Sequence, residues 1–121
     1  DYLKVIACFD LVSNNADRKA SHCLLDSNGR VWSIDHGLTF HSENKTRTVI
    51  SDYSNEFIPV ELLDSLGYLN EKLNNPTGRV NYFVGLLNGS EIVALIQRIE
   101  MVLEMKVYPD LNSYMIPWPP V

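Results

Sequence analysis

Apolar positions along the chain predict four helices. Residues 2–13 are apolar on nearly every side, which is typical of a buried helix. Leucines recur every three or four residues after Pro59, and this stripe stops before Pro76, so a second helix is expected there. Residues 79–87 predict a short third helix. A capping-box pattern at residues 88–91 then opens the longest helix, which ends by Pro109.

Two short segments near the start of the chain, separated by a turn, predict a β-hairpin. Residues 22–26 and 30–34 are expected to be its strands, and residues 26–29 its turn, with Asn28 and Gly29 supplying positive φ angles. A hairpin brings its two outer ends together. The polar segment before the first strand and Asp35 after the second strand are therefore expected to converge.

The remaining segments lack clear periodicity. Residues 36–58 predict a long irregular loop, which in a compact domain is usually functional or mobile. The prolines of residues 115–121 exclude a helix, so we expect an extended tail anchored by Trp118. Together these elements predict a mainly helical α+β fold. We expect residues 1–121 to form a single domain, with a small antiparallel hairpin that carries the site.

Composition and charge narrow the function classes. Hydrophobic residues make up 45% and charged residues 21% of the 121-residue chain, which is ordinary for a globular protein. The net charge of −5 argues against binding to nucleic-acid phosphates. No apolar run approaches the ~20 residues of a transmembrane helix. Cys8 and Cys23 form no CxxC pair, so we expect buried free thiols in a reducing, cytoplasmic location.

Asp17, His22 and Asp35 are the main candidates for chemistry. Phosphoryl transfer needs one carboxylate to orient or deprotonate the attacking hydroxyl and metal ligands to hold the nucleotide phosphates. In kinases a metal ligand follows the catalytic Asp by five residues, and a second Asp follows the next hairpin. His22 stands five residues after Asp17, and Asp35 follows the predicted hairpin. Arg18 or Lys19 would stabilise charge on the transferred phosphate.

These residues also carry a resemblance to a known family. Residues 15–19 with His22, followed by residues 34–41, resemble bacterial proteins described as phosphatidylinositol 3- and 4-kinase-related. Those proteins look like distant members of the protein-kinase-like superfamily and are related to the HipA toxin kinases. The resemblance covers nearly the whole chain, including residues 45–49 and 117–120.

The resemblance implies a fold and a function. The chain would be the C-terminal lobe of a protein-kinase-like fold, with Asp17 as the catalytic aspartate and Asp35 as a metal ligand. ATP and Mg²⁺ or Mn²⁺ are the implied cofactors. His22 stands where such kinases usually carry Asn, and an imidazole favours Mn²⁺ over Mg²⁺. No phosphate-binding glycine motif occurs here, so the N-terminal nucleotide lobe of the parent chain is an expected partner, and this segment alone should be inactive.

Several residues keep more than one interpretation. Asp17 and Asp35 would also suit turn caps at the hairpin base. His22 would also suit a strand-end position that orients Asp17. Two further residues are either structural braces or direct participants in chemistry: Asn15 and Asp10. His36 and His41 are either functional groups or loop residues that serve packing and lie at the surface. Lys45 and Arg47 are either contacts to phosphate or substrate or solvated loop charges.

The function classes that stay open are three. The first is an ATP-dependent phosphotransferase with an unknown acceptor, which the sequence does not identify as lipid, protein or metabolite. The second is a kinase-like binding module without catalytic activity. The third, weaker alternative is a metal-dependent phosphohydrolase that uses the same carboxylates.

Overall fold

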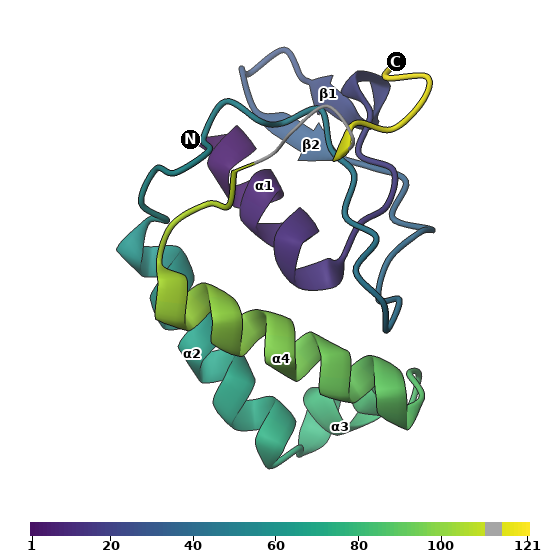
Figure 1. Cartoon of the computed structure of the whole chain (residues 1–121), viewed down its shortest axis with the longest axis vertical. Helices are drawn as coiled ribbons and strands as arrows, with labels where there is room; N and C mark the ends of the chain where they lie inside the picture. Colours follow the sequence, from purple (N-terminus) through teal and green to yellow (C-terminus); the bar gives the residue numbers. More distant parts are fainter. Residues whose placement is uncertain (111–114) are drawn as a thin grey trace.

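The computed structural model describes residues 1–110 and 115–121 and has an α+β fold that is mainly helical, as predicted. The elements follow in the order α1 (Tyr2–Ser13), the 3₁₀ helix η1 (Ala20–His22), β1 (Cys23–Leu25), β2 (Val31–Ser33), α2 (Val60–Asn74), α3 (Gly78–Val84) and α4 (Gly89–Met105). In Figure 1, α1 and the hairpin occupy one half of the molecule, and α2, α3 and α4 form the other.

Helix α1 is the central element. It packs against both α4 and β2, so it joins the hairpin to the helical half. Asp1 caps its first turn by accepting a hydrogen bond from the Leu3 amide at 3.0 Å. Its other end closes at Asn14, which adopts a left-handed conformation with φ of 58°. The polar segment that begins there therefore leaves the helix in a fixed direction.

The hairpin forms as the sequence predicts, with shorter strands. Cys23 pairs with Ser33, and Leu25 pairs with Val31, in antiparallel register. At the turn, the Asp26 carboxylate accepts amide hydrogen bonds from Asn28 and Arg30. Gly29 has a φ of 79°, whereas the positive φ predicted for Asn28 is wrong. The Asp26 side chain stabilises the turn around Asn28, so one left-handed residue is sufficient.

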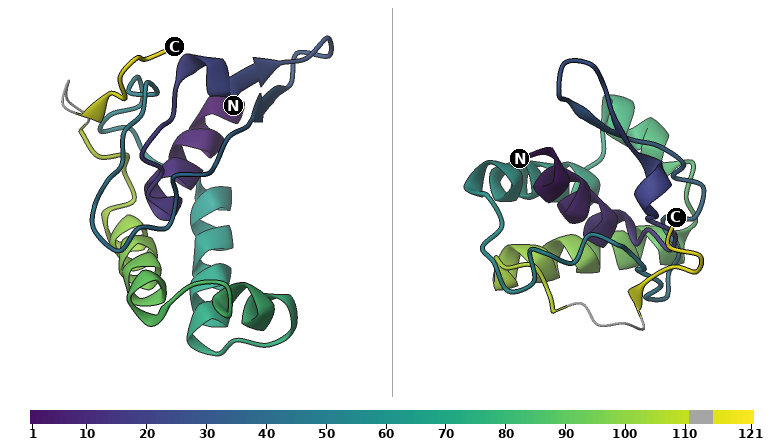
Figure 2. Two further views of the ribbon diagram at one scale, coloured as in Figure 1. Left: turned by 90° about the vertical axis from the view of Figure 1, so that its right-hand side faces the viewer. Right: turned by 90° about the horizontal axis from the view of Figure 1, so that it is seen from above.

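The helical half buries the predicted leucine and isoleucine stripes. Helices α2 and α4 pack side by side, and α3 packs against α2 (Figures 1 and 2). Leu66 and Leu73 of α2 are buried with Leu95 and Ile99 of α4. Helix α4 has the predicted capping box, because Asn88 and Glu91 bond each other's amides. Helix α3 ends at Val84, three residues before the predicted end, where tight turns replace the helical hydrogen bonds.

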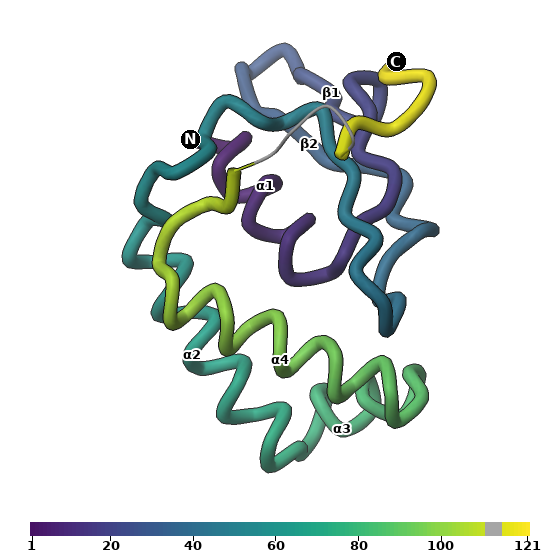
Figure 3. The backbone as a smooth tube through the Cα atoms, in the orientation of Figure 1, coloured from purple at the N-terminus to yellow at the C-terminus, as the bar shows by residue number. Residues whose placement is uncertain are grey.

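The irregular segment and the tail return to the N-terminal half. Residues 36–58 contain no helix or strand and run across α1, as the tube in Figure 3 shows. The tail ends beside η1, where the Ala20 amide donates to the Pro120 carbonyl at 2.9 Å. The predicted anchoring role of Trp118 is wrong, because its side chain is 89% exposed. Main-chain hydrogen bonds, rather than an aromatic anchor, hold this tail.

Two further expectations concern the cysteines and membrane-spanning helices. Both cysteines are free, as predicted, but only Cys8 is buried, whereas Cys23 is half-buried on the hairpin. Within residues 1–110 and 115–121, no helix combines the length and the apolar character that a membrane crossing requires.

Cys8 makes the stability of the fold depend on pH. Burial raises the pKa of its thiol from 9.0 to about 11. The unfolded chain therefore loses this proton at a lower pH than the folded chain, and the free energy of unfolding should fall between about pH 9 and pH 11. The expected loss is about 2 kcal/mol. Urea unfolding followed by circular dichroism at several pH values measures it.

The Cys8→Ala variant is the control for this prediction. It should start less stable because of the cavity, yet show a smaller decrease between about pH 9 and pH 11. Burial is the largest cause of the raised pKa of Tyr108, and this cause acts in both proteins. Parallel pH profiles for the two proteins would contradict the assignment to Cys8.

Candidate functional site

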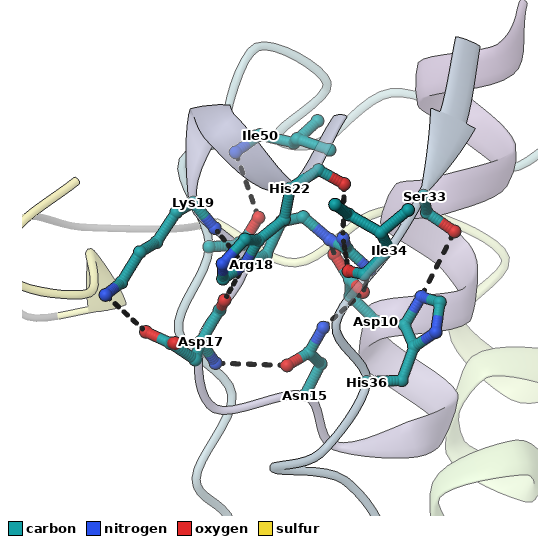
Figure 4. A network of polar contacts seen from close by, with 11 residues as sticks. Asp10, Asn15, Asp17, Arg18, Lys19, His22, Ser33, Ile34, His36 and Ile50 are labelled. Carbon is teal, nitrogen blue, oxygen red and sulfur yellow. Dashed lines mark hydrogen bonds and ion pairs between the residues drawn. The ribbon is translucent and has the colours of Figure 1, made fainter. Parts of the chain in front are cut away.

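A buried ion pair lies at the centre of the polar segment. Arg18 and Asp10 form two parallel hydrogen bonds of 2.9 Å, from Nε to Oδ2 and from Nη2 to Oδ1. The side chains are 0% and 1% exposed, respectively. Figure 4 shows this pair between the loop that follows α1 and the second strand. The bidentate geometry offsets part of the cost of removing both charges from water.

Arg18 also joins the two sides of the hairpin base. Its Nη1 donates to the main-chain carbonyls of His22 at 3.1 Å and Ile34 at 3.2 Å. Its main chain pairs with the long loop, through the Arg47 carbonyl and the Val49 amide, both at 3.0 Å. From the sequence, either Arg18 or Lys19 was expected to stabilise charge on the transferred phosphate. The structure instead buries the Arg18 guanidinium in protein contacts, which makes Arg18 a positioning residue.

Asn15 and Asp10 are braces in this network. Asn15 Nδ2 donates to Asp10 Oδ1 at 3.0 Å, and its Oδ1 accepts the Asp17 amide at 3.0 Å. Asn15 is fully buried. Of the two interpretations open for each residue, the structure favours bracing. The buried pair therefore fixes the main chain of Asp17 through one intermediate amide.

The Asp17 carboxylate points to the partly exposed side of the loop. Its Oδ1 lies 3.6 Å from Lys19 Nζ, and the two side chains are 27% and 20% exposed. Both groups are therefore reachable by a ligand, unlike Arg18. A carboxylate next to a primary ammonium can orient a hydroxyl and balance charge on a phosphate at the same time.

His22 connects Asp17 to Asp35. Its Nδ1 lies 2.8 Å from the Asp17 carbonyl oxygen, and its Nε2 lies 3.5 Å from Asp35 Oδ2. A carbonyl oxygen accepts only, so Nδ1 carries the proton. The Lys19 amide lies farther from Nδ1, at 3.5 Å, and is the weaker of the two contacts. In a neutral ring, Nε2 then presents its lone pair beside the Asp35 carboxylate.

Asp35 is the most exposed member of the group. Its side chain is 63% exposed. Its φ of 57° places it in the left-handed region, which a non-glycine residue adopts rarely and often near functional sites. It stands two residues after the end of β2, so the hairpin brings it to His22 at the end of η1, as the sequence predicts for this end of the hairpin.

The group is smaller than a complete metal centre. His22 and Asp35 supply one nitrogen and one carboxylate. In the described part of the chain, no three His, Cys, Asp or Glu residues lie close enough together to hold a metal ion. The Asp17 side chain is paired with Lys19 rather than joined to that pair. Two protein ligands suit Mg²⁺ or Mn²⁺ only if water or phosphate oxygens complete the coordination.

The other candidate residues lie apart from this pair. His36 Nε2 contacts Ser33 Oγ at 3.1 Å, and the ring stacks edge-on against Phe9. In Figure 4, His36 points toward Ser33 and away from Asp17. Lys45 is exposed and pairs with Glu43 at 3.4 Å. The Arg47 side chain is exposed, and His41 is exposed and accepts the Glu43 amide through Nδ1 at 2.9 Å.

Two residues that hold the loop were not singled out from the sequence. Asn14 is fully buried, and its side chain bonds the carbonyls of His41 and Glu43 and the amide of Lys45. Arg98 of α4 donates to the Val12 and His41 carbonyls. The tolerance of Asn for left-handed conformations at a helix end is a sequence signal for Asn14. No local signal marks Arg98, because its partners are far away in the chain.

One curated protein is similar to this chain over nearly its whole length. It is Protein Rv2133c of Mycobacterium tuberculosis, 37% identical over 118 residues, which are 97% of this chain and 42% of that protein. The chain thus spans about two fifths of the length of the curated relative that it matches. No family model matches the chain. No solved structure matches it.

Removing one partner of the buried ion pair should strongly destabilise the fold. Asp10→Asn leaves the Arg18 guanidinium buried without a counter-charge, so the free energy of unfolding should fall by about 3–5 kcal/mol. Urea unfolding followed by circular dichroism measures this loss. Glu56→Gln is the matched control, because it removes one carboxylate from the exposed Lys4–Glu56 pair. The control should cost less than about 1 kcal/mol. Equal losses in both variants would refute the role of the buried pair.

Proposed function

We propose that this chain is the C-terminal catalytic lobe of an ATP-dependent phosphotransferase that resembles phosphatidylinositol 3- and 4-kinases. The acceptor is a hydroxyl group of an unknown substrate, and the location is the cytoplasm. The observation that carries the proposal is the His22–Asp35 contact of 3.5 Å beside the main chain of Asp17. An imidazole and a carboxylate from the two sides of the hairpin base thus meet at one partly exposed edge, next to the main chain of Asp17.

Asp17 is the proposed catalytic residue. Its carboxylate is accessible, while Asn15 and His22 hold its main chain on either side. A fixed backbone under an exposed carboxylate is a suitable arrangement for orienting or deprotonating an acceptor hydroxyl. Lys19, 3.6 Å away, is the proposed cation for the transferred phosphoryl group.

His22 and Asp35 are the proposed metal ligands. Nε2 offers a lone pair, and Asp35 offers carboxylate oxygens that are largely exposed. This donor pair fits a cation that takes its remaining ligands from water and nucleotide phosphates, which is the usual habit of Mg²⁺. The nitrogen ligand favours Mn²⁺ in the same geometry. When bound, the metal would neutralise charge on the phosphates of ATP.

A nucleotide-binding lobe elsewhere in the parent chain is part of the proposal. The hairpin exposes apolar side chains, among them Leu25 at 73% and Trp32 at 48%. Such a surface is suitable for covering by another part of a protein. The greater length of the similar mycobacterial protein is consistent with an additional lobe.

A kinase-like binding module without activity is the second candidate. The Asp17 carboxylate is already paired with Lys19, and among the described residues no third His, Cys, Asp or Glu joins His22 and Asp35 to hold a metal ion. Both observations suit a site that binds a nucleotide or phosphate without turning it over. The two candidates differ in catalysis rather than in binding.

Variants of the two aspartates should separate binding from catalysis in the full-length parent protein. Asp35→Asn should weaken Mn²⁺-ATP binding by about tenfold or more, as measured by isothermal titration calorimetry. Asp17→Asn should leave that binding nearly unchanged and lower the rate of ADP formation by about 10²–10⁴-fold. Asp64→Asn is the matched control, because it removes an exposed carboxylate from α2.

Three outcomes would decide against the enzyme. Nucleotide binding without ADP formation in the unmodified parent protein would favour the binding module. Absence of binding at millimolar Mn²⁺-ATP, or equal binding by Asp35→Asn, would reject both candidates.

His22 should set the preference between metals. His22→Asn replaces the imidazole nitrogen by an amide group, whose oxygen suits Mg²⁺ better. We expect the ratio of ADP formation with Mg²⁺ to that with Mn²⁺ to rise by about tenfold. His36→Asn is the control, because that imidazole contacts Ser33 rather than Asp35. An unchanged ratio in His22→Asn would exclude His22 as a ligand.

A further inference from the structure

A cavity lies on the apolar side of α1. It has a volume of about 490 Å³ and is lined by residues of α1, α2 and α3, together with Phe40 and Leu95. This volume is within the range of small-molecule sites, about 300–1,000 Å³. In the left view of Figure 2, the hairpin and α3 project to the same side of the molecule, and α1 and α2 lie between them.

The walls of this groove are almost entirely hydrocarbon. Phe9 and Val12 contribute from α1, Leu66 and Leu69 from α2, and Phe83 from α3. Phe83 stacks edge-on against Phe40, with 5.6 Å between ring centroids, which gives the groove an aromatic wall. Water gains few hydrogen bonds on such a surface, so an apolar ligand is favoured over solvent.

The few polar groups in the lining differ in whether they can still form a hydrogen bond or ion pair. The Ser65 hydroxyl already donates to the Glu61 carbonyl at 2.9 Å. The Ser13 hydroxyl has no hydrogen-bond partner, and the residue is only 1% exposed, so this group is closed to solvent. Arg79 is exposed at the edge of the groove, and within the described residues its guanidinium makes no hydrogen bond or ion pair. The groove therefore combines one cation at its edge with an extended apolar surface.

We infer that this groove binds a single-chain amphiphile with an anionic head, such as a medium-chain fatty acid. The alkyl chain lies along the Phe9, Leu69 and Phe83 side chains, and the carboxylate pairs with Arg79. Burial of the chain removes apolar surface from water, and the guanidinium gives the head a charge-assisted hydrogen bond.

An anionic ligand explains more of the lining than an uncharged one. A neutral hydrocarbon, or an apolar helix from another protein, would fill the groove but leave Arg79 without a counter-charge. This inference does not depend on phosphotransfer, because none of its residues is a proposed ligand or catalytic group.

The charge component can be tested with decanoate and its uncharged analogue decanol. Isothermal titration of the 121-residue chain should give one decanoate site per chain. Arg79→Gln should weaken decanoate binding by about tenfold and leave decanol binding unchanged. Arg79→Lys should restore part of the loss. Lys72→Gln is the matched control, since Lys72 lies on α2 and does not line the groove. Equal decanoate binding by the unmodified chain and Arg79→Gln would overturn the assignment of the head.

The location can be tested by filling the groove. Ser65 is an exposed lining residue, so Ser65→Phe places a ring in the groove without removing core atoms. This variant should lose binding of both decanoate and decanol at least tenfold, while its circular dichroism spectrum stays that of the unmodified chain. Val93→Phe on α4 adds the same ring outside the groove and should bind normally. Full binding by Ser65→Phe, or no binding by the unmodified chain, would overturn the proposal.

Discussion

The bidentate ion pair between Arg18 and Asp10 is the constraint on which the candidate site depends. It links α1 to the loop that follows it, and through two carbonyls it links that loop to both sides of the hairpin base. A buried pair of this kind adds little net stability compared with apolar residues, but it strongly penalises any arrangement that separates its partners. The pair therefore specifies a geometry. Its consequence is that His22 and Asp35 meet at one exposed edge.

The site and the groove use opposite chemical properties of α1. Asp10 and Asn14 sit in its last turn and at its C-cap, where they organise loops that carry polar groups. Phe9 and Val12 are presented to the groove. Phe9 also contacts His36, so the two regions share a border. A single helix thus supports a polar edge and an apolar cavity because its two faces differ in composition.

The local elements could be read from the sequence to a large extent. The stripes of α2 and α4, the capping box at Asn88 and the turn before Gly29 depend on neighbours within a few residues, and all are present in the structure. The convergence of His22 and Asp35 was predictable for the same reason, since a hairpin joins its own ends. The exposure of Trp118 was not predictable, because the burial of a tail residue depends on surfaces that are distant in the sequence.

The sequence by itself determined the helices, the hairpin and which acidic residues would lie near its open end. The tertiary structure decided which of the polar residues there are accessible. Arg18 and Lys19 are adjacent in the chain, yet one is completely buried and the other borders solvent beside Asp17. Their exposure differs because Asp10, eight residues away from Arg18, is fixed on α1 at hydrogen-bonding distance from the guanidinium. Which polar side chains pair with each other depends on how the chain folds in three dimensions, and the order of residues alone does not specify it.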